Sequence, residues 1–338
     1  MIRTLAQLYL VVCIATFSIT TFADGTCKPI KRLTFDKRIR SKVLAETITQ
    51  LGNYCLNQDI TTPRAYDFEG ERGGGDNVLT IESSNVNINL QQKMIYGEER
   101  GTGAVTTSWH EKDTPYHHIA IYDGIVKSRT FRGIVIGNSF IVRGFHSSFD
   151  DFIGEGEKTD LQFKFANKDW MEQSKKLIEI RNNFPLTEHR IENVKISAGD
   201  LAIAMKGGAN IIKSNTIKVT NGGTASIYLF GPKQLIENNI IIFKGKTRTS
   251  RSSAAPIKIH AADGSIIRNN TIIIESSGED IPQTAISIFD SKNVVIENNQ
   301  IFGTKSVYKI WDEEDKGSSV IESGTTFPSF WKKQRPSF

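Results

Sequence analysis

One six-residue phrase, Ile-x-x-Asn-x-Ile, occurs four times in the second half of this 338-residue chain. Its copies occupy residues 212–217, 236–241, 267–272 and 296–301, and their shared Asn recurs at steps of 24, 31 and 29 residues. Each copy follows a shorter run of alternating apolar residues, at 203–205, 227–229, 257–259 and 286–288, and a fifth run lies at 308–310. Self-similarity at such a period indicates stacked supersecondary units, each burying its apolar face against its neighbours.

The apolar residues within each unit alternate, which is the period of a strand and not of a helix. Short strands with Gly, Asn and Ser at the corners describe one coil of a parallel β-helix. Ile and Val suit the inward positions because β-branched side chains pack well on a pleated surface. We therefore expect an all-β solenoid with coils of about 22–31 residues.

The repeated Asn residues are expected to be structural: Asn215, Asn239, Asn270 and Asn299. Asn tolerates the left-handed backbone conformation that a sharp corner requires. Identical Asn side chains at one corner of successive coils can also form a hydrogen-bonded ladder. An active-site role is the alternative, which the repetition disfavours.

The first 23 residues read as a secretory signal peptide. Arg3 precedes an apolar run from Leu8 to Ile19, and 21–23 read Thr-Phe-Ala before Asp24, which fits a cleavage site. The alternative is an uncleaved membrane anchor. No second long apolar run follows, so we expect a secreted, extracellular or periplasmic monomer without an integral membrane segment.

Removal of the leader leaves two cysteines, Cys27 and Cys55, which in an exported chain predict a disulfide. Metal-ligand spacing is missing around them, so we expect no metal there. Residues 24–50 are expected to be a basic cap over the open end of the core, since an exposed sheet edge recruits other chains. The net charge of +5 fits an acidic partner, whereas no nucleic-acid-binding motif is present.

The opening of the repeat region carries a resemblance. Residues 51–60 read LGNYCLNQDI, and the strand-like runs 78–81, 85–90 and 94–97 follow. This series resembles the first coils of right-handed parallel β-helix proteins of the pectin-lyase-like superfamily, and residues 118–144 continue it. The resemblance covers 51–312 and implies a right-handed coil. The superfamily includes lyases, hydrolases, epimerases, esterases, tailspikes and proteins without an assigned activity.

Two segments depart from the repeat. Residues 146–188 are expected to form an insertion with a short helix over 167–181, which Pro185 ends. This insertion either walls a binding groove or is a passive flap. Residues 313–338 are expected to form a C-terminal cap or tail.

Aligning the short strand phrases predicts two outward rows along one sheet, because side chains alternate on a strand. The first row is Ala204, Tyr228, Lys258, Ser287 and Lys309, and the second is Lys206, Phe230, His260, Phe289 and Trp311. An exposed stripe of aromatic and cationic groups suits an extended acidic polysaccharide, with Tyr228, Phe230, Phe289, Lys309 and Trp311 as the binding residues. The alternative is that the insertion or the tail covers these side chains.

The order of residue types around 199–204 and 256–258 is similar to that of polygalacturonases. By position, Asp200 matches one aspartate of that family and Lys258 matches its lysine. Gly199 and Pro256 depart from the pattern, and only one of the two carboxyl groups that an inverting hydrolase needs is visible. A polygalacturonase-like glycoside hydrolase is therefore a second alternative.

A polysaccharide lyase needs a cation, from Ca²⁺ or from Arg and Lys, to neutralise a uronate, and a base for the proton α to it. Lys206, Lys258, His260 and Arg268, together with Asp200, are the candidate catalytic residues. No cofactor is required by the sequence, although Ca²⁺ would suit this chemistry. The rival interpretation is a non-catalytic, adhesin-type surface β-helix.

His117 and His118 are adjacent. On a strand they would face opposite sides, so they are not expected to bind one metal ion together.

Overall fold

The computed structural model describes residues 27–37, 40–62, 77–98, 103–107, 115–137, 185–223, 225–245, 254–275, 284–304, 306–311 and 317–326. These residues form strands, turns and bends, with no α-helix among them. The all-β prediction is therefore confirmed. Three predicted features lie outside the described residues: the signal peptide, the helix over 167–181 and the end of the tail. Within the described ranges, no helix is long and apolar enough to span a membrane.

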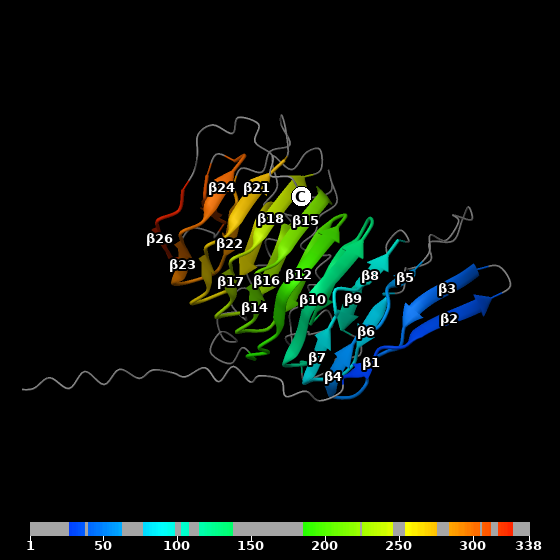
Figure 1. The fold of residues 1–338 in the computed structure, drawn as a ribbon. Helices are drawn as coiled ribbons and strands as arrows, with labels where there is room; N and C mark the ends of the chain where they lie inside the picture. Colours follow the sequence, from blue (N-terminus) through cyan, green and yellow to red (C-terminus); the bar gives the residue numbers. More distant parts are fainter. Residues whose placement is uncertain are drawn as a thin grey trace, which may run out of the picture.

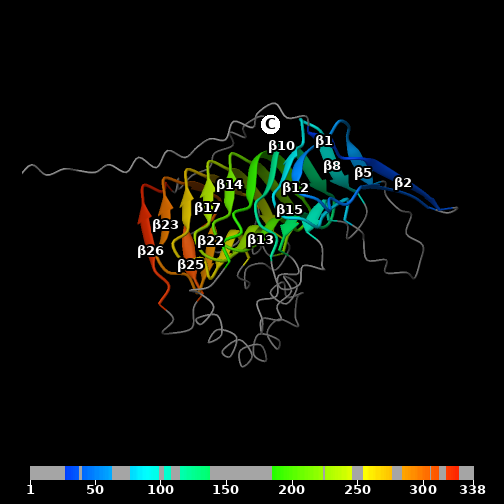
Figure 2. The same ribbon diagram turned by 90° about the horizontal axis from the view of Figure 1, so that it is seen from below.

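Each coil contributes strands to three faces, and within each face the strands of successive coils pair in parallel (Figure 1). Figure 2 shows the coils stacked from the blue N-terminal end to the red C-terminal end. This arrangement is a right-handed parallel β-helix. The predicted fold is confirmed.

The first face runs the length of the stack. Its strands are β1 (Lys28–Pro29), β4 (Gly52–Cys55), β7 (Val86–Asn89), the start of β10 (Ile119–Ser128), the start of β12 (Arg190–Ala198), β14 (Ile211–Lys213), β17 (Leu235–Glu237), β20 (Ile266–Arg268), β23 (Val294–Glu297) and β26 (Val320–Ser323).

The second face adjoins the first, because β10 and β12 are long enough to take part in both. Its strands are β5 (Ile60–Thr62), β8 (Met94–Gly97), the ends of β10 and β12, β15 (Thr216–Gly222), β18 (Ile240–Gly245), β21 (Thr271–Ile274) and β24 (Gln300–Phe302).

The third face is a separate sheet. Its strands are β6 (Leu79–Ile81), β9 (Val105–Thr107), β11 (Arg132–Ile136), β13 (Leu201–Lys206), β16 (Ala225–Phe230), β19 (Ala255–His260), β22 (Ile286–Phe289) and β25 (Tyr308–Ile310). An antiparallel hairpin of β2 (Arg32–Lys37) and β3 (Arg40–Ala45) forms a separate small sheet, and its last residue, Ala45, is buried in the core.

The core lies inside the coils and is built from columns of aliphatic side chains. One column on the first face stacks Ile191, Ile212, Ile236, Ile267 and Ile296 in register, and all five are fully buried. Their neighbours along each strand point outward, as the alternation predicts. The repeated Ile positions are therefore the inward positions.

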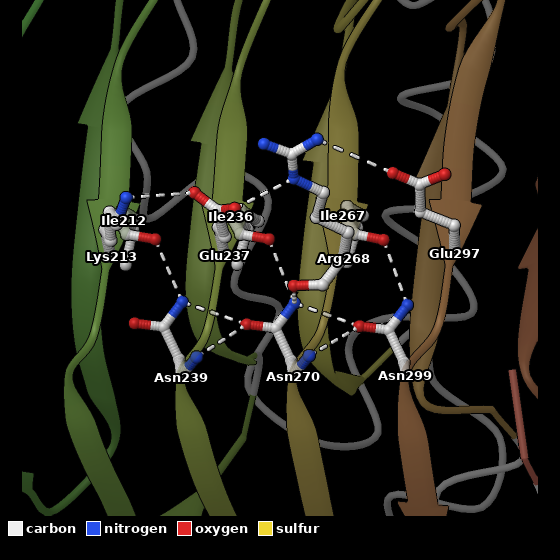
Figure 3. Close-up of polar contacts among 10 residues, drawn as sticks. All are labelled: Ile212, Lys213, Ile236, Glu237, Asn239, Ile267, Arg268, Asn270, Glu297 and Asn299. Carbon is white, nitrogen blue, oxygen red and sulfur yellow. Dashed lines mark hydrogen bonds and ion pairs between the residues drawn. The ribbon is translucent and has the colours of Figure 1, made fainter.

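The Asn ladder is present at the corner between the first and second faces (Figure 3). The side-chain N–H of each ladder residue donates to Oδ1 of the next at 3.0 Å, from Asn215 to Asn239, from Asn239 to Asn270 and from Asn270 to Asn299. Every one of these oxygens also accepts the backbone N–H of the preceding ladder residue. The ladder role is confirmed, and all four Asn residues are buried.

The left-handed corner residue is a different one. The residue before each ladder Asn has a positive φ: Ser214 (56°), Asn238 (57°), Asn269 (56°) and Asn298 (53°). At each corner, one residue adopts the left-handed conformation that bends the chain, and the next residue, the ladder Asn, bonds to the neighbouring coils. Assigning the left-handed conformation to the ladder Asn itself was wrong.

The ends of the stack extend the pattern. Cys27 and Cys55 form the predicted disulfide and join the segment before β1 to β4. Ile30 and Ile48, from the expected N-terminal cap, are buried in the core. Beyond residue 312, β26 pairs in parallel with β23, so the first face includes one more strand than the repeat phrases show.

Candidate functional site

The third face aligns the two rows of outward residues. Ala204, Tyr228, Lys258, Ser287 and Lys309 are direct partners in successive strands. Lys206, Phe230, His260 and Phe289 are aligned likewise, and Trp311 follows β25. The register therefore brings the predicted aromatic and cationic side chains onto one surface.

Most of this surface is buried. Tyr228, Lys258, Phe230 and His260 expose only 1–5% of their area. Lys206, Phe289 and Trp311 are half-buried, and Lys309 alone among the candidates is exposed. Of the two alternatives for the stripe, burial holds in the middle coils, whereas solvent reaches its C-terminal end.

A second apolar cluster lies on the outer side of this face. It is formed by Val135, Leu201, Ala204, Ala225 and Tyr228, and it is separate from the core inside the coils. The outward side of the middle third-face strands therefore behaves as an interior.

Lys258 lies in the middle of the buried part. Its Nζ is 4.8 Å from the ring centroid of Phe289 and 5.4 Å from that of Tyr228. Burial lowers the pKa of Lys258 to about 8, because the charged ammonium loses its hydration. Burial likewise raises the pKa of the Tyr228 phenol. Lys258 thus has an amine that can exchange a proton near neutral pH.

His260 is two residues further along the same strand, on the same side. Its Nε2 lies 3.3 Å from Oδ2 of Asp290, and both side chains are buried. The Phe230 ring meets the imidazole edge-on with centroids 4.9 Å apart, and Phe289 packs at 5.7 Å. A carboxylate on one imidazole nitrogen fixes the orientation of the ring.

Asp290 was not among the predicted site residues. It follows β22 at a position where other coils have Gly207, Gly231 and Ala261, and all four take a positive φ. Asp290 holds this conformation at 42°, where Gly is the unstrained residue. A charged residue in a column of small residues was the available signal.

The exposed end of the surface is formed by three side chains from the last two third-face coils. The rings of Phe289 and Trp311 are stacked, 7° from parallel with centroids 6.1 Å apart. The Nζ of Lys309 lies 3.6 Å from the Trp311 ring centroid. The indole N–H of Trp311 donates to Ser287 Oγ at 3.1 Å, which fixes the plane of the ring.

Two of the candidate catalytic residues lie away from this group. Asp200 stands just before β13, whereas His260 ends β19, so the width of the sheet separates them. The Asp200 carboxylate accepts the backbone N–H of Gly223 at 2.8 Å, which is a corner contact. Lys206 lies in the row of His260, two strands away.

Arg268 lies on the first face, not on the third. Its guanidinium pairs with Glu237 at 3.0 Å and Glu297 at 3.7 Å, and Lys213 pairs with Glu237 at 3.4 Å (Figure 3). Four charges of alternating sign thus run along the outer side of four strands. Grouping Arg268 with Lys258 and His260 was wrong, because outward residues of different faces point in different directions.

The two adjacent histidines share one side of the chain. His118 has a φ of +52°, which breaks the strand alternation, and the Nδ1 atoms of His117 and His118 are 2.8 Å apart. The other nitrogen of His118 pairs with Glu188 at 2.7 Å. Even so, no group of three or more His, Cys, Asp or Glu side chains among the described residues could hold a metal ion.

The comparison with family models agrees with this fold. A family model described as a right handed beta helix region matches residues 201–326. No curated protein sequence matches the chain. A solved structure titled "The complex structure of XylC with xylose" is 14% identical with a TM-score of 0.39, and the alignment covers 70% of this chain and 38% of that one, so the chain spans less than half of that protein. By its three parallel faces and its matched repeats, the chain is a right-handed parallel β-helix repeat protein.

Proposed function

We propose that this protein is exported and binds an extended acidic polysaccharide at the C-terminal end of the third face. The observation that carries the proposal is the stacked Phe289–Trp311 pair with the Lys309 ammonium over the indole. Aromatic side chains offer apolar contact area to a sugar ring, and an exposed ammonium attracts a carboxylate or a sulfate. The hydrogen bond from Trp311 to Ser287 holds the platform in place.

The buried groups behind this platform suit β-elimination. His260, oriented by Asp290, has the arrangement of a base that removes the proton α to a uronate carboxylate. Lys258 supplies a positive charge below its pKa of about 8, which favours the charge that develops on the uronate. Since His260 and Lys258 are buried, a glycan reaches them only if side chains around them move. Binding and cleavage are therefore tested separately.

Binding is tested with the full-length chain and a panel of immobilised polygalacturonate, alginate, chondroitin sulfate and neutral glucan, with and without Ca²⁺. Retention of an acidic glycan that falls at least tenfold in Trp311→Ala and Lys309→Gln is the expected result. Lys292→Gln is the matched control, because it removes an exposed lysine at a corner outside the platform. Equal retention of neutral glucan, or no effect of Trp311→Ala, would contradict the proposal.

Cleavage is tested by following the absorbance of the unsaturated uronate that elimination produces. Loss of product in His260→Gln and Asp290→Asn, with binding retained, assigns the base and its orienting group. Retention without turnover instead supports the second candidate, a non-catalytic surface protein, which the burial of His260 favours. New reducing ends without the double bond would point to hydrolysis. That reaction needs two carboxyl groups on either side of one glycosidic bond, and Asp200 lies far from His260.

A further inference from the structure

A cleft of about 270 Å³ opens on the second face, away from the residues discussed above. Its lining includes Met94 and Tyr96 from β8, Lys127 and Arg129 at the end of β10, Ser197 from β12 and Thr220 from β15. These four strands lie side by side in Figure 1, in cyan to green. An aromatic ring, a thioether, two cations and several hydroxyls thus meet in one depression.

The strand register explains why these side chains meet. Tyr96 pairs with Lys127, which pairs with Ser197, so the three stand in one row across successive coils. The residues between them along the strands, such as Ile95 and Val126, are fully buried in the core. Alternation therefore turns the whole row outward, and the sheet holds it flat and rigid.

Positive charge dominates this part of the second face. Lys127 and Arg129 are exposed, and Lys195 and Lys218 stand outward on the adjoining strands. Within the described ranges, no carboxylate lies within ion-pair distance of these four cations. Arg129 acts on the Tyr96 phenol by lowering its pKa, against burial and Glu98, which together raise it. The phenol and the guanidinium are thus close neighbours at the cleft.

We propose that this cleft binds one acidic sugar unit of an anionic saccharide. The volume suits a single ring, since larger ligands occupy about 300 Å³ or more. Tyr96 and Met94 offer an apolar floor for the ring, and Lys127 with Arg129 holds its carboxylate or sulfate. Ser197 and Thr220 are placed to exchange hydrogen bonds with its hydroxyls.

The direction of the cations suits a polymer. Strands of successive coils are roughly 4.8 Å apart, close to the length of one sugar residue in an extended chain. From Lys127 the next cation in the same row is Lys218, two strands on. A saccharide lying across these strands would therefore meet two positive charges, at Lys127 and Lys218, before the row continues with Ile242. This site does not depend on the Phe289–Trp311 platform, which belongs to another face.

The test uses the full-length chain and isothermal titration calorimetry with four probes: trigalacturonate, a sulfated chondroitin disaccharide, neutral maltotriose and inorganic phosphate. Trigalacturonate or the sulfated disaccharide is expected to bind, and the stronger of the two tells whether carboxylate or sulfate is the preferred group. Arg129→Gln and Lys127→Gln should each weaken binding by roughly tenfold, as loss of a charge-assisted hydrogen bond implies. Both substitutions are at exposed positions and leave the core intact.

Lys233→Gln, at an exposed corner, is the matched control and should leave this binding unchanged. Trp311→Ala removes the platform on the third face, so acidic-saccharide binding that persists in this variant belongs to the cleft. If only Trp311→Ala weakens binding, the saccharide occupies the third face and the cleft proposal is wrong. Equal binding of maltotriose, or phosphate binding as strong as that of the acidic sugars, would also overturn it. Tyr96→Ala should reduce saccharide binding but not the response to phosphate.

Discussion

His189 lies where the chain enters β12, and its imidazole is buried among backbone groups. Its Nδ1 accepts the backbone N–H of Ile119 at 3.2 Å, and the backbone N–H of His189 donates to Oδ1 of Asn210 at 2.9 Å. An acceptor at Nδ1 requires the neutral ring with the proton on Nε2. Burial, with His118 and then His117 adding repulsion, lowers the pKa of His189 to about 3.

This shift predicts that the protein loses stability in mild acid. The unfolded chain binds a proton at His189 near pH 6.5, whereas the folded chain stays neutral to about pH 3. Acidification through this window therefore favours the unfolded state, by up to about 1.4 kcal/mol per pH unit. Urea unfolding midpoints at pH 7, 5 and 4 measure it. His189→Gln should flatten the dependence, and an unchanged slope in that variant would refute the assignment.

At the residue scale the sequence predicts side chains that repeat and misses those that depend on a local exception. The ladder Asn residues recur, so their role could be read from spacing. The shared side of His117 and His118 depends on one positive φ, and the contact of Asp290 with His260 depends on another. A single amino-acid sequence does not predict which non-Gly residues adopt the left-handed conformation.

Among the elements, the Asn corner joins successive coils most directly. Asn270 donates to the backbone carbonyls of Ile236 and Arg268 and to the side chain of Asn299, while it accepts two N–H groups of Asn239. The bonds to Ile236, Asn239 and Asn299 are buried, and the bond to Arg268 is partly buried. Their loss therefore leaves several buried donors and acceptors without partners.

Asn270→Ala is accordingly expected to lower the free energy of unfolding by roughly 2–4 kcal/mol. Chemical denaturation followed by circular dichroism gives the value. Gln300→Thr is a suitable control, since Gln300 is exposed on a neighbouring strand and should change stability by less than about 0.5 kcal/mol. A similar loss in both variants would mean that the ladder adds nothing specific.

The strands themselves were predictable, but their mutual orientation was not. Alternation identified which residues face out of β13, β16, β19 and β22, and the register confirms those rows. It could not predict that Tyr228 and Lys258 are buried although they face outward, because exposure depends on what packs outside the coil. Nor could it place Arg268, because the corner angle between two faces is not a property of either strand.

For the whole molecule, each coil contacts mainly the next, so stability is expected to be local along the stack. The disulfide between Cys27 and Cys55 closes a sequence separation of 28 residues at the N-terminal end. Its entropic effect on the unfolded chain is roughly 3–4 kcal/mol. This stabilisation should be largest in the first coils and should decrease toward the last coil.

The double variant Cys27→Ser with Cys55→Ser tests this by hydrogen exchange and mass spectrometry. Peptides within 48–62 and 79–90 should exchange faster than in the parent, whereas peptides within 286–302 should be unchanged. The untreated parent and a reduced, alkylated sample provide the matched controls. Uniformly faster exchange along the chain would show that the stack unfolds as one cooperative unit instead.

At this largest scale the sequence is most informative, because a solenoid is specified by short local patterns that repeat. Its limits lie where repetition stops. The repeat phrases end near residue 312, yet β26 adds a strand without the Ile-x-x-Asn-x-Ile phrase and with Ile321 exposed. Among the described strands β26 pairs with β23 alone, so it lacks the second neighbour that constrains the inner coils to be alike.

The alternating charges of Lys213, Glu237, Arg268 and Glu297 also constrain how many coils the stack can gain or lose. Deleting the coil that carries Glu237 would set Lys213 beside Arg268, two like charges on adjoining strands. Deleting two coils would set Lys213 beside Glu297 and restore attraction. We therefore expect gain or loss of an even number of coils in this part of the protein to keep these attractions, and of an odd number to bring like charges together.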